Sequence, residues 1–207
     1  GAGEIVVDEN VQAALEKQGG KAEKIRTARR KGTEADKEEE KTHTAIQYQL
    51  LKIGAALNYD VLAAANDRSK SHSDEKFSFI SLPALPAMEI GEDVLKTINL
   101  IDVIWLEKGT NKIVCAFEIE KSTSIYSGIL RLSDLALTFS GNGIMITLVA
   151  PDEREKEVIA QLKRPSLSAG KAGISYILFS DLCAHCASIR KLGSDYTIME
   201  KLARRCV

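Results

Sequence analysis

Residues 98–121 read INLIDVIWLEKGTNKIVCAFEIEK, and this stretch decides the fold. Two apolar runs, 98–106 and 112–119, flank the turn-forming segment 107–111, so we predict a β-hairpin here. Both runs are apolar on both faces, which is typical of strands in the centre of a covered sheet. The hairpin is therefore expected at the core of the domain.

Helices and further strands alternate around this hairpin. Apolar residues with helical spacing predict a helix over about 36–57, and a short apolar run predicts a buried strand over 61–65. Residues 66–96 are expected to be irregular. The later elements that we expect are a helix from Ser122 or Thr123 to about 138, a strand over 144–149, a helix over 152–162 that Asp152 and Glu155 open as a capping box, a strand over 174–179 and a helix over 181–191. This order predicts an α/β domain with an αβββαβ core, in which helices flank a mixed central sheet.

Three acidic residues sit at one end of the hairpin. A three-residue loop would pair Lys108 with Lys112 and place Asp102 directly opposite Glu118, so that both side chains point to one face. Because strand residues alternate between faces, Glu120 would point to that face as well. A register error of one residue would send Asp102 to the other face. The sequence thus predicts three converging carboxylates.

Such a cluster indicates a cation site. Clustered carboxylates repel one another unless a cation binds, and oxygen-rich sites suit Mg²⁺ or Mn²⁺. Lys121 follows directly, and a helix beginning near Ser122 would offer backbone N–H groups, which attract phosphate. A metal here could activate water and stabilise the charge of a phosphodiester transition state. The alternative is that the acids mark strand ends in solvent.

The charge is unevenly distributed. The chain has 207 residues and a formal net charge of −1, and 19 of its first 42 residues are charged. A basic cluster spans 21–31 and an acidic cluster spans 34–40, while Gly19-Gly20 predicts a break before them. We therefore expect residues 1–35 to form a charged helical segment or linker, or a basic arm on a nucleic-acid backbone, and residues 36–207 to form the main domain. Near-neutrality is compatible with DNA binding if the acids of the hairpin face a divalent cation.

Several classes of protein are disfavoured. The chain has no apolar run of membrane-spanning length and no secretory signal, and four cysteines in 207 residues do not indicate a disulfide framework, so we expect a cytoplasmic protein that does not bind membranes. No glycine-rich phosphate loop is present, so no nucleotide cofactor is expected. Cys183 and Cys186 form half of a metal motif and are interpreted as half-buried helix residues. Because the chain opens at Gly1 without an initiator methionine, we expect an upstream domain of a larger protein.

The residues of the hairpin and its flanks resemble a known family. A helix, a strand, a hairpin with Asp and then Glu-x-Glu, a helix and a strand resemble the restriction-endonuclease-like fold of the PD-(D/E)xK nuclease superfamily, and the resemblance is strongest to uncharacterised bacterial members. It covers roughly residues 42–166. The blocks that carry it are 43–47 (HTAIQ), 66–68 (NDR), 101–106 (IDVIWL), 149–154 (VAPDER) and, most specifically, 116–135 (AFEIEKSTSIYSGILRLSDL).

The resemblance implies Mg²⁺- or Mn²⁺-dependent hydrolysis of a DNA phosphodiester, in a restriction or other defence system. Asp102 and Glu118 would hold the metal, and Glu120 stands where the superfamily usually has lysine, so it would be a ligand or a general base. Lys121 could reach the site only if the strand bends or ends at Glu120. The superfamily often adds an acid from the first helix. Here the nearest candidates, four residues apart on one helix face, are Gln47 and His43, which would orient water.

Other residues and other functions remain open at this point. DNA-contact candidates are Arg68, Ser122, Tyr126 and Arg131. Many nucleases of this fold dimerise to cut both strands, so a homodimer is expected by analogy. The main alternative is a non-catalytic DNA-binding or assembly module that retains the nuclease fold, because Glu120 replaces the usual lysine and the first helix offers no acid. A metal-dependent RNase or a small-molecule phosphodiesterase is a third option.

Overall fold

The computed structural model describes the backbone of residues 9–121, 125–165 and 173–206, and the side chains of these ranges from residue 33 onward. The chain divides into two compact units, Gly1–Lys41 and Thr42–Val207. Helix α1 spans Glu9–Ala56 and therefore contributes to both. The helix continues through Gly19-Gly20, so the predicted break is wrong. A glycine costs a helix only about 1 kcal/mol, and strong helix formers such as Lys, Glu and Ala flank this pair.

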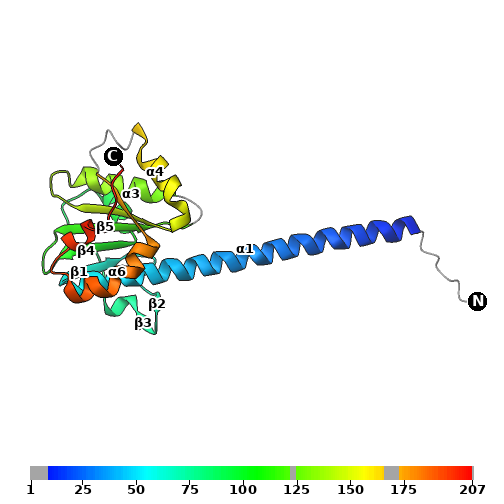
Figure 1. The fold of residues 1–207 in the computed structure, drawn as a ribbon, viewed down its shortest axis with the longest axis horizontal. Helices are drawn as coiled ribbons and strands as arrows, with labels where there is room; N and C mark the ends of the chain where they lie inside the picture. The colour runs from blue at the N-terminus through cyan, green and yellow to red at the C-terminus, as the bar shows by residue number, and fades with distance from the viewer. Residues whose placement is uncertain (1–8, 122–124, 166–172, 207) are drawn as a thin grey trace, which may run out of the picture. The chain divides into compact units, whose positions relative to one another are not determined.

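A mixed five-stranded sheet is the centre of residues 42–207 (Figure 1). Its strands, in spatial order, are β1 (Tyr59–Ala63), β4 (Val103–Glu107), β5 (Ile113–Ile119), β6 (Met145–Ala150) and β7 (Ser175–Leu178). The first three strands pair antiparallel, and β5, β6 and β7 pair parallel. The predicted α/β class, mixed sheet and αβββαβ order are confirmed.

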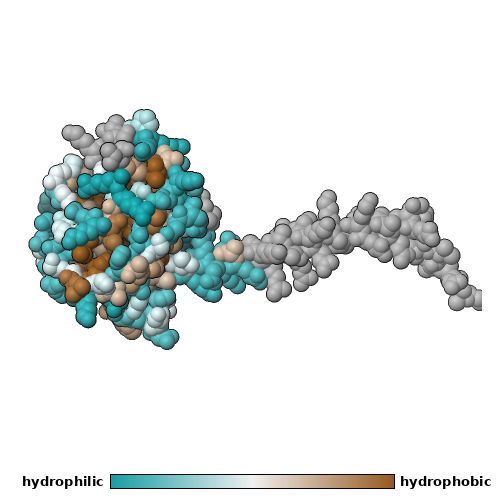
Figure 2. Space-filling view, viewed as in Figure 1, coloured by the Kyte–Doolittle hydropathy of each residue, from teal (hydrophilic) through white to brown (hydrophobic). Residues whose placement is uncertain are grey.

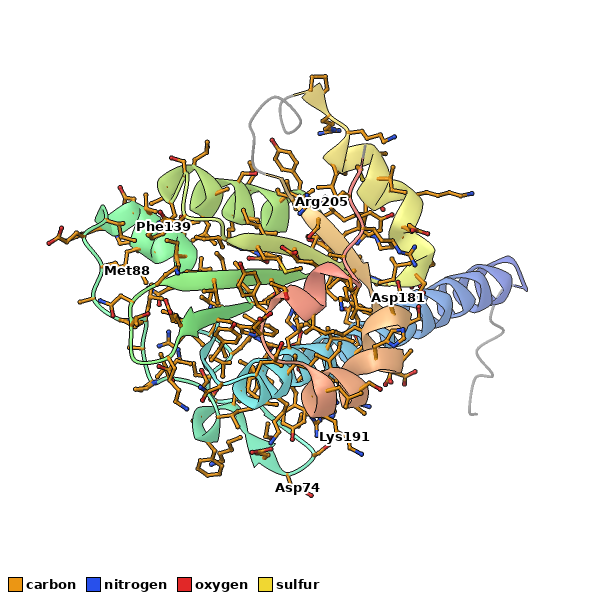
Figure 3. The ribbon with its side chains drawn as sticks, turned by 60° about the vertical axis from the view of Figure 1, so that its left-hand side comes forward. Asp74, Met88, Phe139, Asp181, Lys191 and Arg205 are labelled. Atoms are coloured by element: carbon orange, nitrogen blue, oxygen red, sulfur yellow. The ribbon has the colours of Figure 1, made fainter. Side chains whose placement is uncertain are left out.

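Helices cover both faces of the sheet. On one face, the C-terminal part of α1, α6 (Phe179–Leu192) and α7 (Thr197–Glu200) pack over Trp105, Phe117 and their neighbours. On the other face lie α2 (Glu92–Ile98), α3 (Ile125–Thr138) and α4 (Glu155–Leu162). Figure 3 shows side chains filling the space on either side of the strands. This double cover explains why β4 and β5 carry an apolar residue at nearly every position.

The segment 66–98 contains more regular structure than the sequence predicts. Strands β2 (Ser71–His72) and β3 (Glu75–Lys76) form a small hairpin with Asp74 at its turn, which projects from the body in Figure 3. The 3-10 helix η1 (Phe77–Phe79) follows it. The predicted strand from Ile98 is wrong at its start, because Ile98 ends α2 and β4 begins only at Val103. Residues 98–106 are mostly apolar, so the sequence does not show where α2 ends and β4 begins.

The register of the β4–β5 hairpin contains a compensating irregularity. Near the turn, the Glu107 N–H donates to the Lys112 carbonyl oxygen at 2.9 Å, so the loop has four residues and the predicted Lys108–Lys112 pair is wrong. A β-bulge between Trp105 and Leu106 then shifts the pairing by one residue. Beyond it Val103 pairs with Phe117, and the next step places Asp102 opposite Glu118. The bulge therefore restores the predicted register at the acidic end.

The predicted capping box at Asp152 is also wrong. Residues Asp152–Arg154 form the 3-10 helix η2, whose N-cap is Pro151. Asp152 instead accepts a hydrogen bond of 3.1 Å from the Ser180 N–H, at the first turn of α6. The predicted cap of α3 at Ser122 or Thr123 lies outside the described residues.

None of the helices in the described ranges combines the length and apolar character needed to cross a membrane. Figure 2 shows a face of residues 42–207 on which hydrophilic side chains surround smaller hydrophobic patches.

Candidate active site

A pocket of about 230 Å³ opens where β4 begins and β5 ends. Asp102 directly precedes β4, and Glu120 and Lys121 directly follow β5. The residues that line the pocket are His43, Asp67, Asp102, Glu118, Ile119, Glu120, Lys121, Ser127 and Arg131. Four carboxylates therefore meet two long cationic side chains and an imidazole in one small space.

Asp102 is held between the sheet and α1. Its Oδ2 accepts a hydrogen bond of 2.7 Å from the Ile119 N–H, and the same oxygen lies 3.3 Å from Nε2 of His43. The Nδ1 atom of His43 is buried without a hydrogen-bond partner. These contacts fix one oxygen of Asp102 and direct the carboxylate toward the end of β5.

Gln47 supports this arrangement from one turn further along α1. It is fully buried, and its Nε2 donates to the Asp102 carbonyl oxygen at 2.9 Å and to Oδ2 of Asp67 at 3.1 Å. Its Oε1 is buried without a partner. Gln47 thus links the residue that precedes β4 to the loop that follows β1.

Glu118 forms a two-pronged ion pair with α3. Arg131 donates from Nε to Oε1 at 2.7 Å and from Nη2 to Oε2 at 2.6 Å. The side chain of Glu118 is only 2% exposed, whereas that of Arg131 is 27% exposed. Burial raises the pKa of the Glu118 carboxyl, and the Arg131 guanidinium opposes that shift.

Glu120 and Lys121 lie at the point where β5 ends. Burial is the main cause that raises the pKa of Glu120, to about 8, and the nearby charge of Arg154 opposes it. The regular strand ends at Ile119, and Lys121 lines the pocket. Arg154 donates a hydrogen bond to the carbonyl oxygen of Lys121 and pairs with Glu157 at 2.9 Å. The early strand end lets consecutive residues face the same space, which regular alternation would forbid.

Gly128 gives α3 its close approach to the acidic residues. A Cβ atom at this position would lie 2.6 Å from Oε1 of Glu120, 3.3 Å from Cβ of Glu118 and 3.3 Å from its Oε2. Only a glycine leaves these two carboxylates in place beneath the helix.

The donor set of the pocket fits a hard divalent cation, because carboxylate oxygens are the preferred ligands of Mg²⁺ and Mn²⁺. A buried acid whose pKa is raised to about 8 is also one that a bound cation would stabilise in its ionised form. As the side chains stand, no three His, Cys, Asp or Glu residues among those described are placed to hold one ion. Both oxygens of Glu118 face Arg131 instead.

The predicted site residues are distributed as follows. The pocket lining includes His43, Asp102, Glu118, Glu120, Lys121 and Arg131, and Gln47 lies behind it. Arg68 does not line it: its guanidinium donates to the carbonyl oxygen of Pro83 at 2.9 Å and to Oδ1 of Asn99 at 3.2 Å, which ties two loops together. Tyr126 is 52% exposed on α3, outside the lining. Ser122 lies outside the described residues.

Asp67 is a pocket residue that the sequence indicated only as part of the segment 66–68 at a strand end, and not as a site residue of its own. It pairs with Lys70 at 2.7 Å through Oδ1 and accepts from Gln47 through Oδ2. The available signal was its position between Asn66 and Arg68 in a block that resembles the nuclease family. Of that block, Asp67 lines the pocket and Arg68, the predicted DNA contact, does not.

We expect Asp67→Asn to lower the rate of any metal-dependent cleavage by roughly tenfold. Asp67 holds Gln47, which donates to Asp102, and residues that orient the ligands of a metal typically contribute 10- to 100-fold. The matched control is Asp93→Asn, which removes the same kind of i,i+3 Asp–Lys pair from the exposed surface of α2. Initial cleavage rates would be compared at a temperature at which both variants are folded. Equal rates for the two variants would show that Asp67 does not contribute to the cleavage reaction.

Comparison with models of protein families gives a match over most of the chain. A family model described as the C-terminal domain of the type II restriction enzyme NmeDI matches residues 24–205. No curated protein and no solved structure matches the chain. The matched range includes the whole pocket and every element of the sheet. The chain belongs to the family of type II restriction enzyme NmeDI C-terminal domains.

Proposed function

We propose that residues 36–207 form the metal-dependent endonuclease domain of a restriction enzyme, with a PD-(D/E)xK-type site that hydrolyses DNA phosphodiester bonds. The observation that carries this proposal is the convergence of Asp102, Glu118 and Glu120 on one pocket at the end of a buried hairpin. Membership of a type II restriction enzyme family supports DNA as the substrate and Mg²⁺ as the cofactor, since such enzymes typically require it.

In this proposal the acidic residues hold the cation, and their neighbours organise the reactants. Asp102, Glu118 and Glu120 would be the ligands, and a bound Mg²⁺ would supply a Lewis acid and lower the pKa of a bound water. His43 and Gln47 fix Asp102 from behind and would orient the attacking water. Lys121 lines the same pocket and supplies a positive charge for the phosphate that is cleaved.

The remaining parts of the proposal concern assembly and DNA contact. Arg131 and Tyr126 on α3, with Ser122 before that helix, are the proposed contacts to the DNA backbone. Arg68 is a weaker candidate because three acceptors, the carbonyl oxygens of Ala63 and Pro83 and Oδ1 of Asn99, already engage its guanidinium. We further propose a cytoplasmic enzyme in which residues 1–35 act as a charged connection and two copies cut the two strands. Because the family is described as a C-terminal domain, we also propose that another domain precedes this one.

The test is cleavage of supercoiled plasmid DNA by the 207-residue chain. We expect nicked or linear product with Mg²⁺ or Mn²⁺, none in EDTA, and none from Glu118→Gln with either metal. A parallel reaction on RNA of matching sequence separates a DNase from an RNase. Cleavage that persists in EDTA, or in a folded Glu118→Gln protein, would contradict the proposal.

Two features favour the alternative of a non-catalytic DNA-binding or assembly module. Arg131 already neutralises Glu118, and Glu120 stands where a lysine is usual, so the pocket could be a relic that no longer takes a metal. Calorimetric titration with Mn²⁺ separates the two. Binding at sub-millimolar Mn²⁺ supports the nuclease, and no heat at millimolar Mn²⁺ supports the module.

A further inference from the structure

Arg131 is the side chain whose contacts the proposed function does not explain. Its guanidinium holds both oxygens of Glu118 at 2.6–2.7 Å, and Glu118 is one of the proposed metal ligands. A guanidinium paired with both oxygens of a carboxylate takes one lone pair on each oxygen, so that a metal is left only the outer lone pairs, and its positive charge repels a second cation nearby. The ion pair with Arg131 and a contact with a metal therefore compete for Glu118.

We propose that Arg131 and the divalent metal compete for Glu118, and that Arg131 moves to the DNA phosphate when the metal binds. This inference rests on the proposed nuclease function. Arg131 would then couple the binding of metal and DNA. The phosphate draws the guanidinium away from Glu118 and thereby strengthens metal binding. The metal in turn strengthens phosphate binding by the same factor.

The surroundings of Arg131 allow this exchange. The neighbouring helix residues Ile129 and Leu132 are fully buried, and Gly128 packs directly over the two glutamates, so the backbone of α3 stays fixed. The Arg131 side chain is 27% exposed and lines the pocket, so its guanidinium can turn outward by side-chain rotation alone. Arginine is suited to both partners because its planar fork matches carboxylate and phosphate equally well.

The charge balance of the pocket supports the same conclusion. Without a metal, Asp67, Asp102, Glu118 and Glu120 face one another in a small volume, and a guanidinium on Glu118 offsets part of that charge. With a dication bound, the guanidinium would be repelled, and a phosphate at the pocket mouth would be the nearest anion.

A plain structural ion pair makes the opposite prediction. If Arg131 only orients Glu118 and anchors α3 to the sheet, its removal should disorder a metal ligand and weaken metal binding. If Arg131 competes, its removal should strengthen metal binding. The sign of the change therefore decides between the two roles.

The experiment is calorimetric titration of Mn²⁺ into the DNA-free chain, for the wild type, Arg131→Gln and Arg131→Lys. We expect Arg131→Gln to bind Mn²⁺ about tenfold more tightly, and Arg131→Lys to show a smaller gain because one ammonium replaces only part of the fork. The control is Arg204→Gln, which removes an arginine that pairs with Glu155 and Asp181 away from the pocket; Asp181 is labelled in Figure 3. This control should bind Mn²⁺ as the wild type does.

A second measurement uses the wild type and does not depend on how the variants fold. A phosphorothioate duplex that resists cleavage should raise the Mn²⁺ affinity of the wild type about tenfold and that of Arg131→Gln much less. Equal or weaker Mn²⁺ binding in both variants, or no effect of the duplex on the wild type, would overturn the inference. Failure of the nuclease proposal looks different, because the wild type would then neither bind Mn²⁺ nor cleave DNA.

Discussion

Asp102→Asn should lower the rate of Mg²⁺-dependent DNA cleavage by about a thousandfold or more while the chain remains folded. Loss of one anionic ligand weakens the metal site and removes several kcal/mol of transition-state stabilisation, and each 1.36 kcal/mol is a factor of about ten in rate. The change is isosteric. Oδ1 of the asparagine can still accept the hydrogen bond from the Ile119 N–H that now measures 2.7 Å.

The fold should tolerate this substitution because, without a metal, the negative charge of Asp102 is repelled by the acidic residues around it. Asp102 adds to the electrostatic causes that raise the pKa values of Glu118 and Glu120, so its neutralisation relieves repulsion. The 3.3 Å contact with His43 loses the negative charge of its partner, because the oxygen that accepts from Ile119 also makes this contact. We expect a change in the free energy of unfolding of about 1 kcal/mol or less, measured by urea denaturation in EDTA.

Asp60→Asn is the matched control for Asp102→Asn. Asp60 also accepts a backbone hydrogen bond, from the Gly109 N–H at 2.9 Å, but it lies on β1, beside the turn end of the β4–β5 hairpin. Its variant should cleave at the wild-type rate. If Asp102→Asn retained more than a tenth of the wild-type rate, Asp102 would not be a metal ligand.

Gly128→Ala should reduce cleavage by about a hundredfold with little loss of stability. The new Cβ would lie 2.6 Å from Oε1 of Glu120, so that carboxylate must move, and misplacement of a reacting group by about 1 Å costs on the order of 100-fold. The contact at 3.3 Å with Cβ of Glu118 is tighter than usual and pushes on the strand itself.

The stability of Gly128→Ala reflects two opposing effects. Overpacking costs about 1–3 kcal/mol, whereas alanine in place of glycine favours a helix interior by about 1 kcal/mol. The net change in the free energy of unfolding should therefore stay within about 2 kcal/mol. Gly91→Ala is the control, because its Cβ meets nothing within 4 Å. Wild-type cleavage by Gly128→Ala would show that the positions of Glu118 and Glu120 beneath α3 do not matter for the reaction.

Most of the sheet could be predicted from the sequence. The strands β4, β5, β6 and β7 are long apolar runs bounded by turn residues, and α3 has regular helical spacing. The failures lie where the local pattern was ambiguous. The helix α2 has only seven residues, and its last apolar residue, Ile98, runs directly into the apolar residues before β4. The two-residue strands β2 and β3 leave no periodic signal.

The prediction for the acidic end of the hairpin assumed a three-residue loop, whereas the loop has four residues. The four-residue loop alone would have sent Asp102 to the opposite face from Glu118. The bulge between Trp105 and Leu106 reverses that shift. A bulge depends on how both strands twist and pack against their neighbours, so the residues of one strand do not reveal it.

By itself the sequence determined the α/β class, the order of the elements and the presence of three acids near one sheet end, because these follow from local periodicity and strand alternation. Only the tertiary structure decided which groups meet there. Arg131 lies 13 residues from Glu118, and Asp67 lies 20 residues from Gln47. Such pairs form only when α1 and α3 pack against the sheet, and their geometry depends on the close approach at Gly128. The chemistry of the pocket is therefore set by packing between distant segments, which no local pattern encodes.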